Sequence, residues 1–151
     1  MDMLIKLYVL PEDDVPMPEY ELRRVLPSER TKLAELVEAH FSRGWADEFL
    51  TASVGQPPRS FVALDEAGNF VGFSCYDGAF KGFFGPVGVI GTHRGKGIGK
   101  ALTLEALRAM RADGYAYAIA GWVSDEAFYR EQFGAELIPD SEPGAYAGKL
   151  K

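Results

Sequence analysis

Hydrophobic and polar positions follow two different periods along the first third of the chain. Residues 4–10 and 20–26 are short apolar runs that predict strands, joined by an acidic, proline-punctuated connector over residues 11–18. After Ser28, apolar residues recur at helical spacing and predict an amphipathic helix with the stripe Leu33, Leu36, Val37, His40 and Phe41. A second short helix is expected over residues 45–53.

The rest of the chain predicts a strand-rich segment followed by alternating strands and helices. Residues 59–64 and 69–76 form a predicted hairpin, and Pro86 and the glycines of residues 82–90 indicate a bulge in a third strand. A helix over residues 98–113 is apolar on more than one side, so we expect it to pack on the sheet and to be covered again. The remaining expected elements are a strand (115–122), a short helix (125–133) and a terminal strand pair (135–139 with 145–150).

The length and composition are those of one folded domain. The chain has 151 residues, of which 47% are hydrophobic and 25% charged. No repeat, low-complexity tract or linker interrupts the order of elements. We therefore expect a single α/β domain over residues 1–151, built on one mixed sheet.

Charge and special residue types remove several classes of function. The 16 Lys and Arg residues against 22 Asp and Glu residues give a formal charge of −6, which argues against a surface that binds nucleic acid. Cys75 is the single cysteine, so neither an intrachain disulfide nor a zinc site of paired cysteines is expected. The start of the chain lacks the pattern of a secretory signal, and no apolar run approaches membrane-spanning length. We expect a cytoplasmic protein that does not bind membranes.

The most informative segment is GPVGVIGTHRGKGIGKA, residues 85–101, which joins a predicted strand to a predicted helix. Backbone N–H groups at the start of a helix are unsatisfied donors, and the helix dipole adds partial positive charge there. Glycines let an anion approach these groups, and Arg94, Lys96 and Lys100 add positive charge. The segment therefore predicts a cradle for phosphate or pyrophosphate.

Two familiar phosphate-binding motifs do not fit this loop. A Walker A loop has four residues between its first glycine and Gly-Lys and then Ser or Thr, whereas here three residues separate Gly95 from Gly99 and Ala101 follows Lys100. The G-x-G-x-x-G pattern of dinucleotide-binding folds fails as well, because its third glycine would fall at Lys100 or Leu102.

The loop resembles the R/Q-x-x-G-x-G/A signature of the GNAT (GCN5-related) N-acetyltransferase superfamily, written here as Arg94-Gly95-Lys96-Gly97-Ile98-Gly99. The resemblance extends to the surrounding order of elements from about Tyr20 onward. It implies a mostly antiparallel mixed sheet of about seven strands flanked by helices, with residues 1–19 as an extra N-terminal strand and connector.

The resemblance also implies acetyl-CoA as co-substrate and assigns its binding residues. The pyrophosphate would bind Arg94, Gly95, Lys96, Gly97, Ile98, Gly99 and Lys100, and the pantetheine arm would pair with Val87, Gly88 and Val89. A bulge near residues 85–88 would free an N–H group for the thioester carbonyl, and the strand at 115–122 would splay away to open the cleft.

Tyr129 matches the tyrosine with which family members protonate the departing thiolate, a role that suits a phenol at neutral pH. Packing of this tyrosine against the sheet edge is the alternative. The general base is open among Asp77, which we favour, Glu48, Glu126 and a water chain. Trp122 departs from the family pattern, which often has an asparagine there. Cys75 fits buried packing better than an acyl-cysteine route.

These residues predict an enzyme that transfers acetyl from acetyl-CoA to a primary amine of a small molecule or peptide, by direct attack and without a metal. A non-catalytic acyl-CoA-binding or sensor domain of the same fold is the alternative, and a nucleotide-binding regulatory module is a third class. The net charge favours a cationic acceptor without identifying it. The second apolar face of the helix at 98–113 is compatible with a homodimer.

Overall fold

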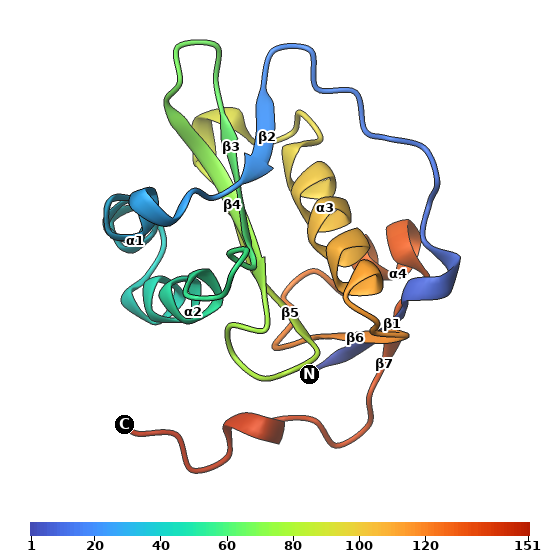
Figure 1. Cartoon of the computed structure of the whole chain (residues 1–151). Coiled ribbons are helices and arrows are strands. Elements are labelled where there is room, and N and C mark those ends of the chain that lie inside the picture. Colours follow the sequence, from blue (N-terminus) through green and yellow to red (C-terminus); the bar gives the residue numbers. More distant parts are fainter.

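Seven strands pair into one sheet in the order β2-β3-β4-β5-β6-β1-β7 in the computed structural model, which describes residues 1–151 (Figure 1). All neighbouring strands are antiparallel except β5 and β6, which are parallel. The prediction of a mostly antiparallel sheet of about seven strands is thus confirmed. The strands are β1 (Met3–Lys6), β2 (Glu21–Arg24), β3 (Ser60–Leu64), β4 (Phe70–Tyr76), β5 (Phe83–Val89), β6 (Tyr117–Ala120) and β7 (Glu136–Leu137).

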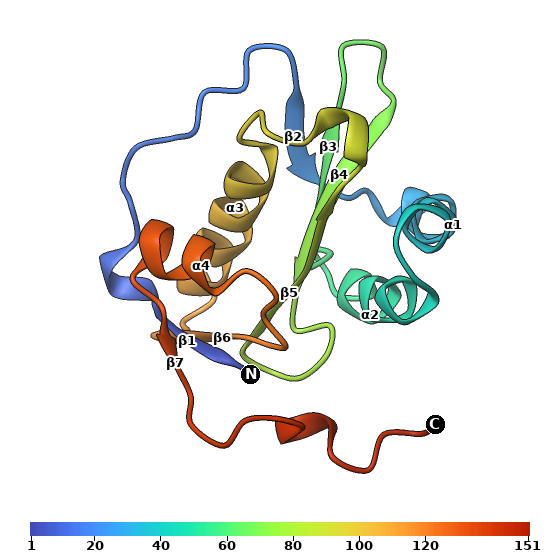
Figure 2. The ribbon, with the colours of Figure 1, turned by 180° about the vertical axis from the view of Figure 1, so that it is seen from behind.

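Helices cover both faces of the sheet, as the two opposite views show (Figures 1 and 2). The helices are α1 (Arg30–His40), α2 (Arg43–Ser53), α3 (Ile98–Ala112) and α4 (Glu126–Phe133). Helices α1 and α2 lie on one face and α3 and α4 on the other. None of the four has the length and apolar character needed to cross a membrane.

Two hydrophobic clusters fill the spaces between the helices and the sheet. One joins α1 and α2 to β3 and β4 around the buried residues Phe49 and Phe73. The other joins α3 to the sheet and includes Leu102, Leu107 and residues of β1. Side chains alternate between the faces of a strand, so β4 supplies Phe73 to the first cluster, while Ser74 turns to α3 and donates to the carbonyl of Leu102 at 2.9 Å.

The N-terminal strand occupies an interior position in the sheet, between β6 and β7. Met3 and Ile5 are fully buried, whereas Leu4 and Lys6 on the opposite face are partly exposed. The strand predicted over residues 4–10 is shorter than expected, because the chain turns into a 3₁₀ helix at Leu7–Val9. This strand pairs with two neighbours, so it is part of the central architecture and not an appendage.

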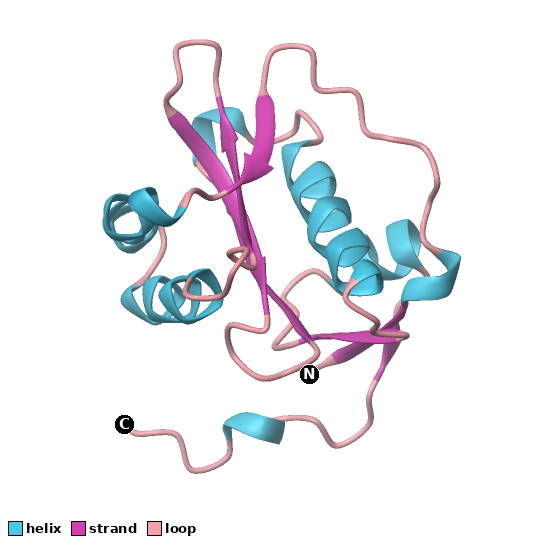
Figure 3. Cartoon of the chain, viewed as in Figure 1, coloured by secondary structure: helices cyan, strands magenta, loops and turns pink.

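The prediction of a strand over residues 145–150 is wrong. Glu136–Leu137 pairs with β1, and the following residues form a loop with a single 3₁₀ turn at Gly144–Tyr146 (Figure 3). Pro139 and Pro143 lack the N–H that a strand ladder needs, and the chain leaves the sheet after Leu137, so the outer edge of β7 has no partner strand. We call residues 138–151 the C-terminal segment.

The connector between β1 and β2 covers the second apolar face of α3. Leu7, Val15 and Met17 join the cluster that contains Leu104. Arg108 of α3 ties the connector down by donating to the carbonyls of residues 11, 12 and 13 and by pairing with Asp14. The expectation of a second cover over α3 is confirmed, and the cover comes from the same chain. The second face of α3 is therefore not open and gives no support for a homodimer.

Candidate functional site

A cavity of about 790 Å³ opens where β5 and β6 separate. The two strands pair only at Phe83 with Ile119 and at Phe84 with Ala120, after which β5 continues alone. The cavity is lined by residues of β5, the ends of α1 and β6, the first turns of α2 and α3, α4 and the C-terminal segment. The predicted splay of these strands is confirmed, and this separation of β5 from β6 creates the cavity.

The part of β5 beyond Phe84 has one edge free of strand partners. Its register with β4 shifts between Ser74 and Tyr76, which confirms the predicted irregularity near Pro86. The N–H of Ile90 donates to Val71 of β4, so by the two-residue alternation of a strand Val87 and Val89 present their backbone groups to the cavity. The Nε of Arg94 donates to the Val89 carbonyl at 3.1 Å, which agrees with that orientation.

The loop before α3, residues 94–100, contains a run of free backbone N–H donors, and we call it the donor loop. The backbone N–H groups from Gly95 to Lys100 have no acceptor within the chain, and the first backbone hydrogen bond of the helix runs from Ala101 to Gly97 at 3.0 Å. Gly95 and Gly97 have φ values of 80° and 83°, a conformation that side chains with a Cβ rarely adopt. The glycines thus shape a loop with six unpartnered backbone donors beside the helix start, where an anion is favoured.

The predicted cofactor-binding residues are distributed around this loop and the adjacent strand edge. Val87, Gly88, Val89, Arg94 and Gly99 line the cavity. Ile98 is 1% exposed and its side chain belongs to the hydrophobic cluster under α3. Lys96 and Lys100 lie outside the cavity wall; the ammonium of Lys96 is 6.0 Å from the ring of Tyr20.

Phe41 forms part of the cavity wall. The sequence predicted this residue only as a member of the apolar stripe of a helix. A Cβ at Gly88 would lie 2.7 Å from the Phe41 ring, so this glycine is what allows the ring to approach the strand. Phe41 also packs against Trp45, with ring centroids 5.5 Å apart, and both residues line the cavity. The periodicity indicated burial of Phe41 but not the strand it covers.

Tyr129 of α4 lines the cavity and packs beside Phe84 and Phe128. Its hydroxyl has no hydrogen-bond partner in the chain. Every fully buried side-chain polar atom of the protein does have a partner, so the Tyr129 hydroxyl is not fully buried and is open to the cavity. Burial raises the pKa of the phenol well above its usual value, and the nearby Asp125 carboxylate adds to the shift. The group therefore stays protonated at neutral pH and can donate a proton.

Asp77 lies outside the cavity. Its carboxylate accepts the N–H of Gly82 at 2.7 Å and the hydroxyl of Tyr115 at 2.8 Å, and it lies 3.7 Å from the Nε of Arg59. Its φ of 56° is that of a tight turn. These contacts explain the residue as a fixed loop corner, and the expectation that Asp77 is the base finds no geometric support.

Glu48 is the one of the three carboxylate candidates that lines the cavity. It projects from α2 and accepts a hydrogen bond from the Tyr146 hydroxyl at 3.1 Å. Burial raises the pKa of Glu48 above its usual value, against the opposing effects of this hydrogen bond and of the Lys149 ammonium. Glu126 instead faces Arg130 on the surface of α4, 3.8 Å away.

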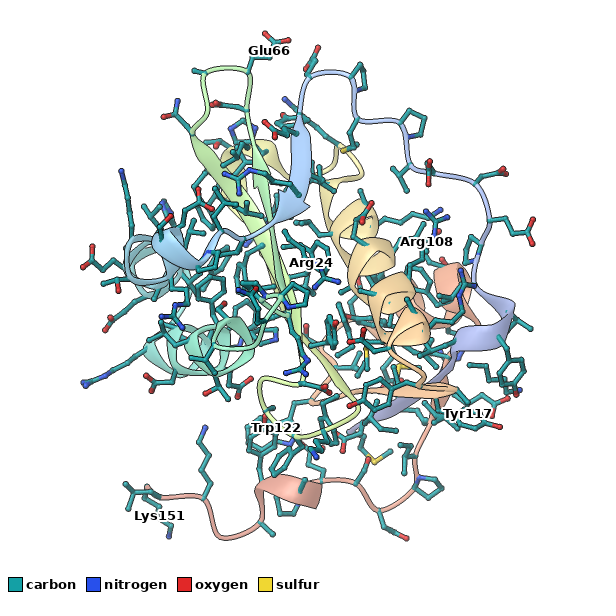
Figure 4. All side chains as sticks on the ribbon, viewed as in Figure 1. Arg24, Glu66, Arg108, Tyr117, Trp122 and Lys151 are labelled. Carbon is teal, nitrogen blue, oxygen red and sulfur yellow. The ribbon has the colours of Figure 1, made fainter.

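The C-terminal segment supplies a wall that the sequence analysis missed. Tyr146 packs on Trp122 with ring centroids 4.4 Å apart, and the ammonium of Lys149 lies 5.6 Å from the centre of each of these two rings. Trp122 lies just above the C-terminal segment in Figure 4. Because residues 145–150 were predicted as a strand, the contact between Tyr146 and Trp122 was not predicted. The positions of the aromatic residues in the sequence did not indicate it either.

Cys75 is fully buried, and burial raises the pKa of its thiol well above the usual value. Its Sγ lies 3.6 Å from the Pro86 carbonyl. The interpretation of Cys75 as a packing residue is confirmed by this burial, and a thiol so hard to ionise is unsuited to nucleophilic attack.

Solved structures similar to this chain share its fold. A GCN5-related N-acetyltransferase from Sphaerobacter thermophilus has a TM-score of 0.70 at 22% identity, over 91% of this chain and 47% of that one. A GNAT family N-acetyltransferase from Escherichia coli in complex with CoA has a TM-score of 0.59 at 20% identity, over 80% and 71%. A GNAT family acetyltransferase from Brucella melitensis in complex with acetyl-CoA has a TM-score of 0.50 at 26% identity, over 65% and 72%.

This chain spans between about a fifth and a half of the length of several of the most similar structures. No curated protein matches its sequence. The sequence model of the Acetyltransferase (GNAT) family matches residues 21–135, which include the free strand edge, the donor loop and Tyr129. Because that match covers most of the chain, the protein belongs to the acetyltransferase (GNAT) family.

Proposed function

We propose that this protein is an acetyl-CoA-dependent N-acetyltransferase that acts on a primary amine of a small molecule or peptide. The observation that carries the proposal is the run of six unpartnered backbone N–H groups, Gly95 to Lys100, beside the cavity between β5 and β6. A pyrophosphate is the anion that best matches a row of donors of this length at a helix start. The family match and the CoA-bound and acetyl-CoA-bound relatives support the same conclusion.

The residues present fit acetyl-CoA. The loop from Arg94 to Lys100 would hold its pyrophosphate, and the free edge at Val87 and Val89 offers the backbone donors and acceptors that an amide-containing pantetheine arm needs. When bound, acetyl-CoA supplies an acyl thioester, whose carbonyl carbon is attacked by the amine and whose sulfur leaves as a thiolate.

Tyr129 serves in this proposal as the general acid. Its hydroxyl opens into the cavity, and its raised pKa keeps the phenol protonated at neutral pH. A thiolate in water is a weaker base than a phenolate, so the phenol can protonate the departing thiolate only where shielding from water makes the thiolate more basic as well. Phe84 and Phe128, which pack against Tyr129, supply part of that shielding.

Glu48 replaces Asp77 as the proposed proton acceptor for the incoming ammonium. It faces the cavity, and a carboxylate with a raised pKa is a stronger base than one in water. A direct attack needs a neutral amine, so a group that binds the ammonium and removes its proton fulfils both requirements.

Calorimetric titration with acetyl-CoA, with ATP as the control, tests the cofactor part of this proposal. We expect a dissociation constant in the micromolar range, about −8 kcal/mol, and no comparable signal with ATP. Release of free thiol in the presence of an amine panel then tests catalysis. Binding without thiol release on any amine would favour a non-catalytic acyl-CoA-binding domain, and effective competition by ATP would favour a nucleotide-binding module.

A further inference from the structure

The far side of the cavity from the donor loop contains a cluster of one carboxylate and two aromatic rings, which we call the ammonium box and define as Glu48, Trp122 and Tyr146. The three residues come from α2, the loop just after β6 and the C-terminal segment, and all three line the cavity. The Tyr146 hydroxyl donates to Glu48 at 3.1 Å, and the Tyr146 ring packs on Trp122 at 4.4 Å. The box is thus assembled by direct contacts between its members.

A cation already lies at this box. The ammonium of Lys149 is 5.6 Å from the ring centres of both Trp122 and Tyr146, which is within the range of cation–π attraction. Lys149 forms no ion pair and no side-chain hydrogen bond, and it is largely exposed, so the aromatic faces are its main contacts. Its charge also acts on Glu48 and favours the ionised carboxylate.

The backbone holds the box in place while leaving Lys149 replaceable. The N–H of Trp122 donates to the buried carboxylate of Asp2 at 2.9 Å, and the Trp122 indole donates to the Pro143 carbonyl at 3.4 Å. The hydroxyl of Ser141 accepts the N–H of Asp2 at 2.8 Å and fixes the start of the C-terminal segment. By contrast, nothing but ring faces and charge retains the flexible side chain of Lys149.

From these contacts we propose that the acceptor substrate is an extended aliphatic primary amine, bound as its ammonium ion in the box of Glu48, Trp122 and Tyr146, and that Lys149 occupies this box until the substrate displaces it. The inference rests on the proposed function and deepens it by naming the substrate class. An unbranched alkylammonium has the shape and charge of the side chain that the box already receives. Small diamines and lysine side chains both carry this group.

The acceptor step balances without a further reactant. The ammonium loses one proton to the Glu48 carboxylate, and the resulting amine forms an N–C bond to the acyl carbon as the C–S bond breaks. The thiolate takes a proton from Tyr129, the second amine proton passes to solvent, and the proton held by Glu48 returns through solvent to the Tyr129 phenolate, so one proton is released in total. The products are an N-acetylated alkylamine and free CoA thiol.

The test measures thiol release by the purified chain with acetyl-CoA and three amines: 1,5-diaminopentane, Nα-acetyl-lysine amide and glucosamine. We expect kcat/KM for at least one of the two alkylamines to exceed that for glucosamine by about tenfold or more. Preference for the diamine would identify a small polyamine as the source of the group, and preference for the lysine derivative would identify a peptide.

Two pairs of variants connect this preference to the box. Trp122→Leu removes one aromatic face, so KM for the alkylamines should rise by about 3- to 30-fold with a smaller change in kcat. Phe80→Leu is the matched control, because Phe80 packs on Tyr146 at 5.4 Å but lies outside the cavity wall, and KM should change less than twofold. Lys149→Met removes the resident cation and should lower KM about threefold or more, whereas Lys149→Arg should keep it near the wild-type value.

The outcomes separate this inference from the proposed function. Thiol release that is best with glucosamine, or alkylamine KM values that stay within twofold of wild type in both Trp122→Leu and Lys149→Met, would overturn the ammonium box and leave the transferase activity standing. No thiol release with any amine would overturn the proposed function, and this inference with it.

Discussion

The carboxylate of Asp2 accepts a hydrogen bond from the backbone N–H of Trp122 at 2.9 Å, so a residue at the start of the chain fixes one near its far end. Trp122 has a φ of 47°, a conformation that is unusual for a residue with a bulky side chain. Asp2 itself is 6% exposed, and its backbone bonds to Ser141 and Ile138. The N-terminal strand therefore positions both Trp122 and the C-terminal segment that packs on it.

Replacement of Asp2 by alanine should weaken the contacts that hold Trp122 and the C-terminal segment in place. The N–H of Trp122 loses its acceptor, so we expect the free energy of unfolding to fall by about 1–3 kcal/mol. KM for the amine should rise while the dissociation constant for acetyl-CoA stays unchanged, because the donor loop is not involved. Urea unfolding and steady-state kinetics check both effects. Asp2→Asn keeps a side-chain oxygen at this position, and it should behave more like wild type than Asp2→Ala does.

Tyr129→Phe removes the proposed proton donor without changing the shape of the ring. We expect turnover to fall by about 10²- to 10⁴-fold, with acetyl-CoA affinity largely unchanged. Thiol-release kinetics and calorimetry on the same preparation measure the two quantities. Tyr117→Phe is a matched control, since Tyr117 is 47% exposed on β6 and its hydroxyl meets only that of Tyr8. Turnover of Tyr129→Phe close to that of wild type would remove Tyr129 from the mechanism.

The pH dependence of the reaction should report Glu48. Its pKa lies above the usual value for a glutamate because of burial, and it acts as a base only when ionised, so activity should be lost as the pH falls through that raised pKa. The Lys149 ammonium and the Tyr146 hydroxyl oppose the shift. Lys149→Met should therefore move the acidic limb of the kcat/KM profile, which reports the free enzyme with Lys149 in the box, to higher pH. An unmoved limb would show that another group controls it.

Gly97→Ala tests the shape of the donor loop. A Cβ at φ 83° is disfavoured, although the space around it is open to ordinary contacts with Val15 and Met17. We expect about 1 kcal/mol less stability and weaker binding of acetyl-CoA, because the loop must change conformation. Gly91→Ala is the control: Gly91 has no positive φ, and nothing lies within 4 Å of the added Cβ. Equal acetyl-CoA affinities for the two variants would argue against the cradle.

Local patterns were sufficient to predict most of the elements and the donor loop. The helical stripe from Leu33 to Phe41 and the glycine-rich run before α3 depend on residues that are neighbours in sequence, and each matches an element in the structure. Tyr129 was predicted as the proton donor from the family resemblance, and it lies on the cavity wall, while its catalytic role stays a prediction. Asp77 was favoured as base because an acidic residue at a strand end can face a cleft, but its bonds to Gly82 and Tyr115 hold it elsewhere.

The ammonium box shows why the other parts of the candidate site could not be predicted from local sequence patterns. Glu48 and Tyr146 are 98 positions apart, and their contact depends on where the C-terminal segment runs after β7. β7 is an edge strand beside β1, and residues 145–150 do not pair with its free side but continue past the sheet.

The sequence by itself determined most of the elements, the glycine-rich loop before α3 and the resemblance to the family, because periodicity, turn residues and helix starts are properties of adjacent residues. Only the tertiary structure decided which carboxylate reaches the cavity, which rings stand beside it and which segment covers α3. Strand order and long-range packing join residues that no spacing rule relates, as where β1 lies between β6 and β7 with Met3 and Ile5 fully buried.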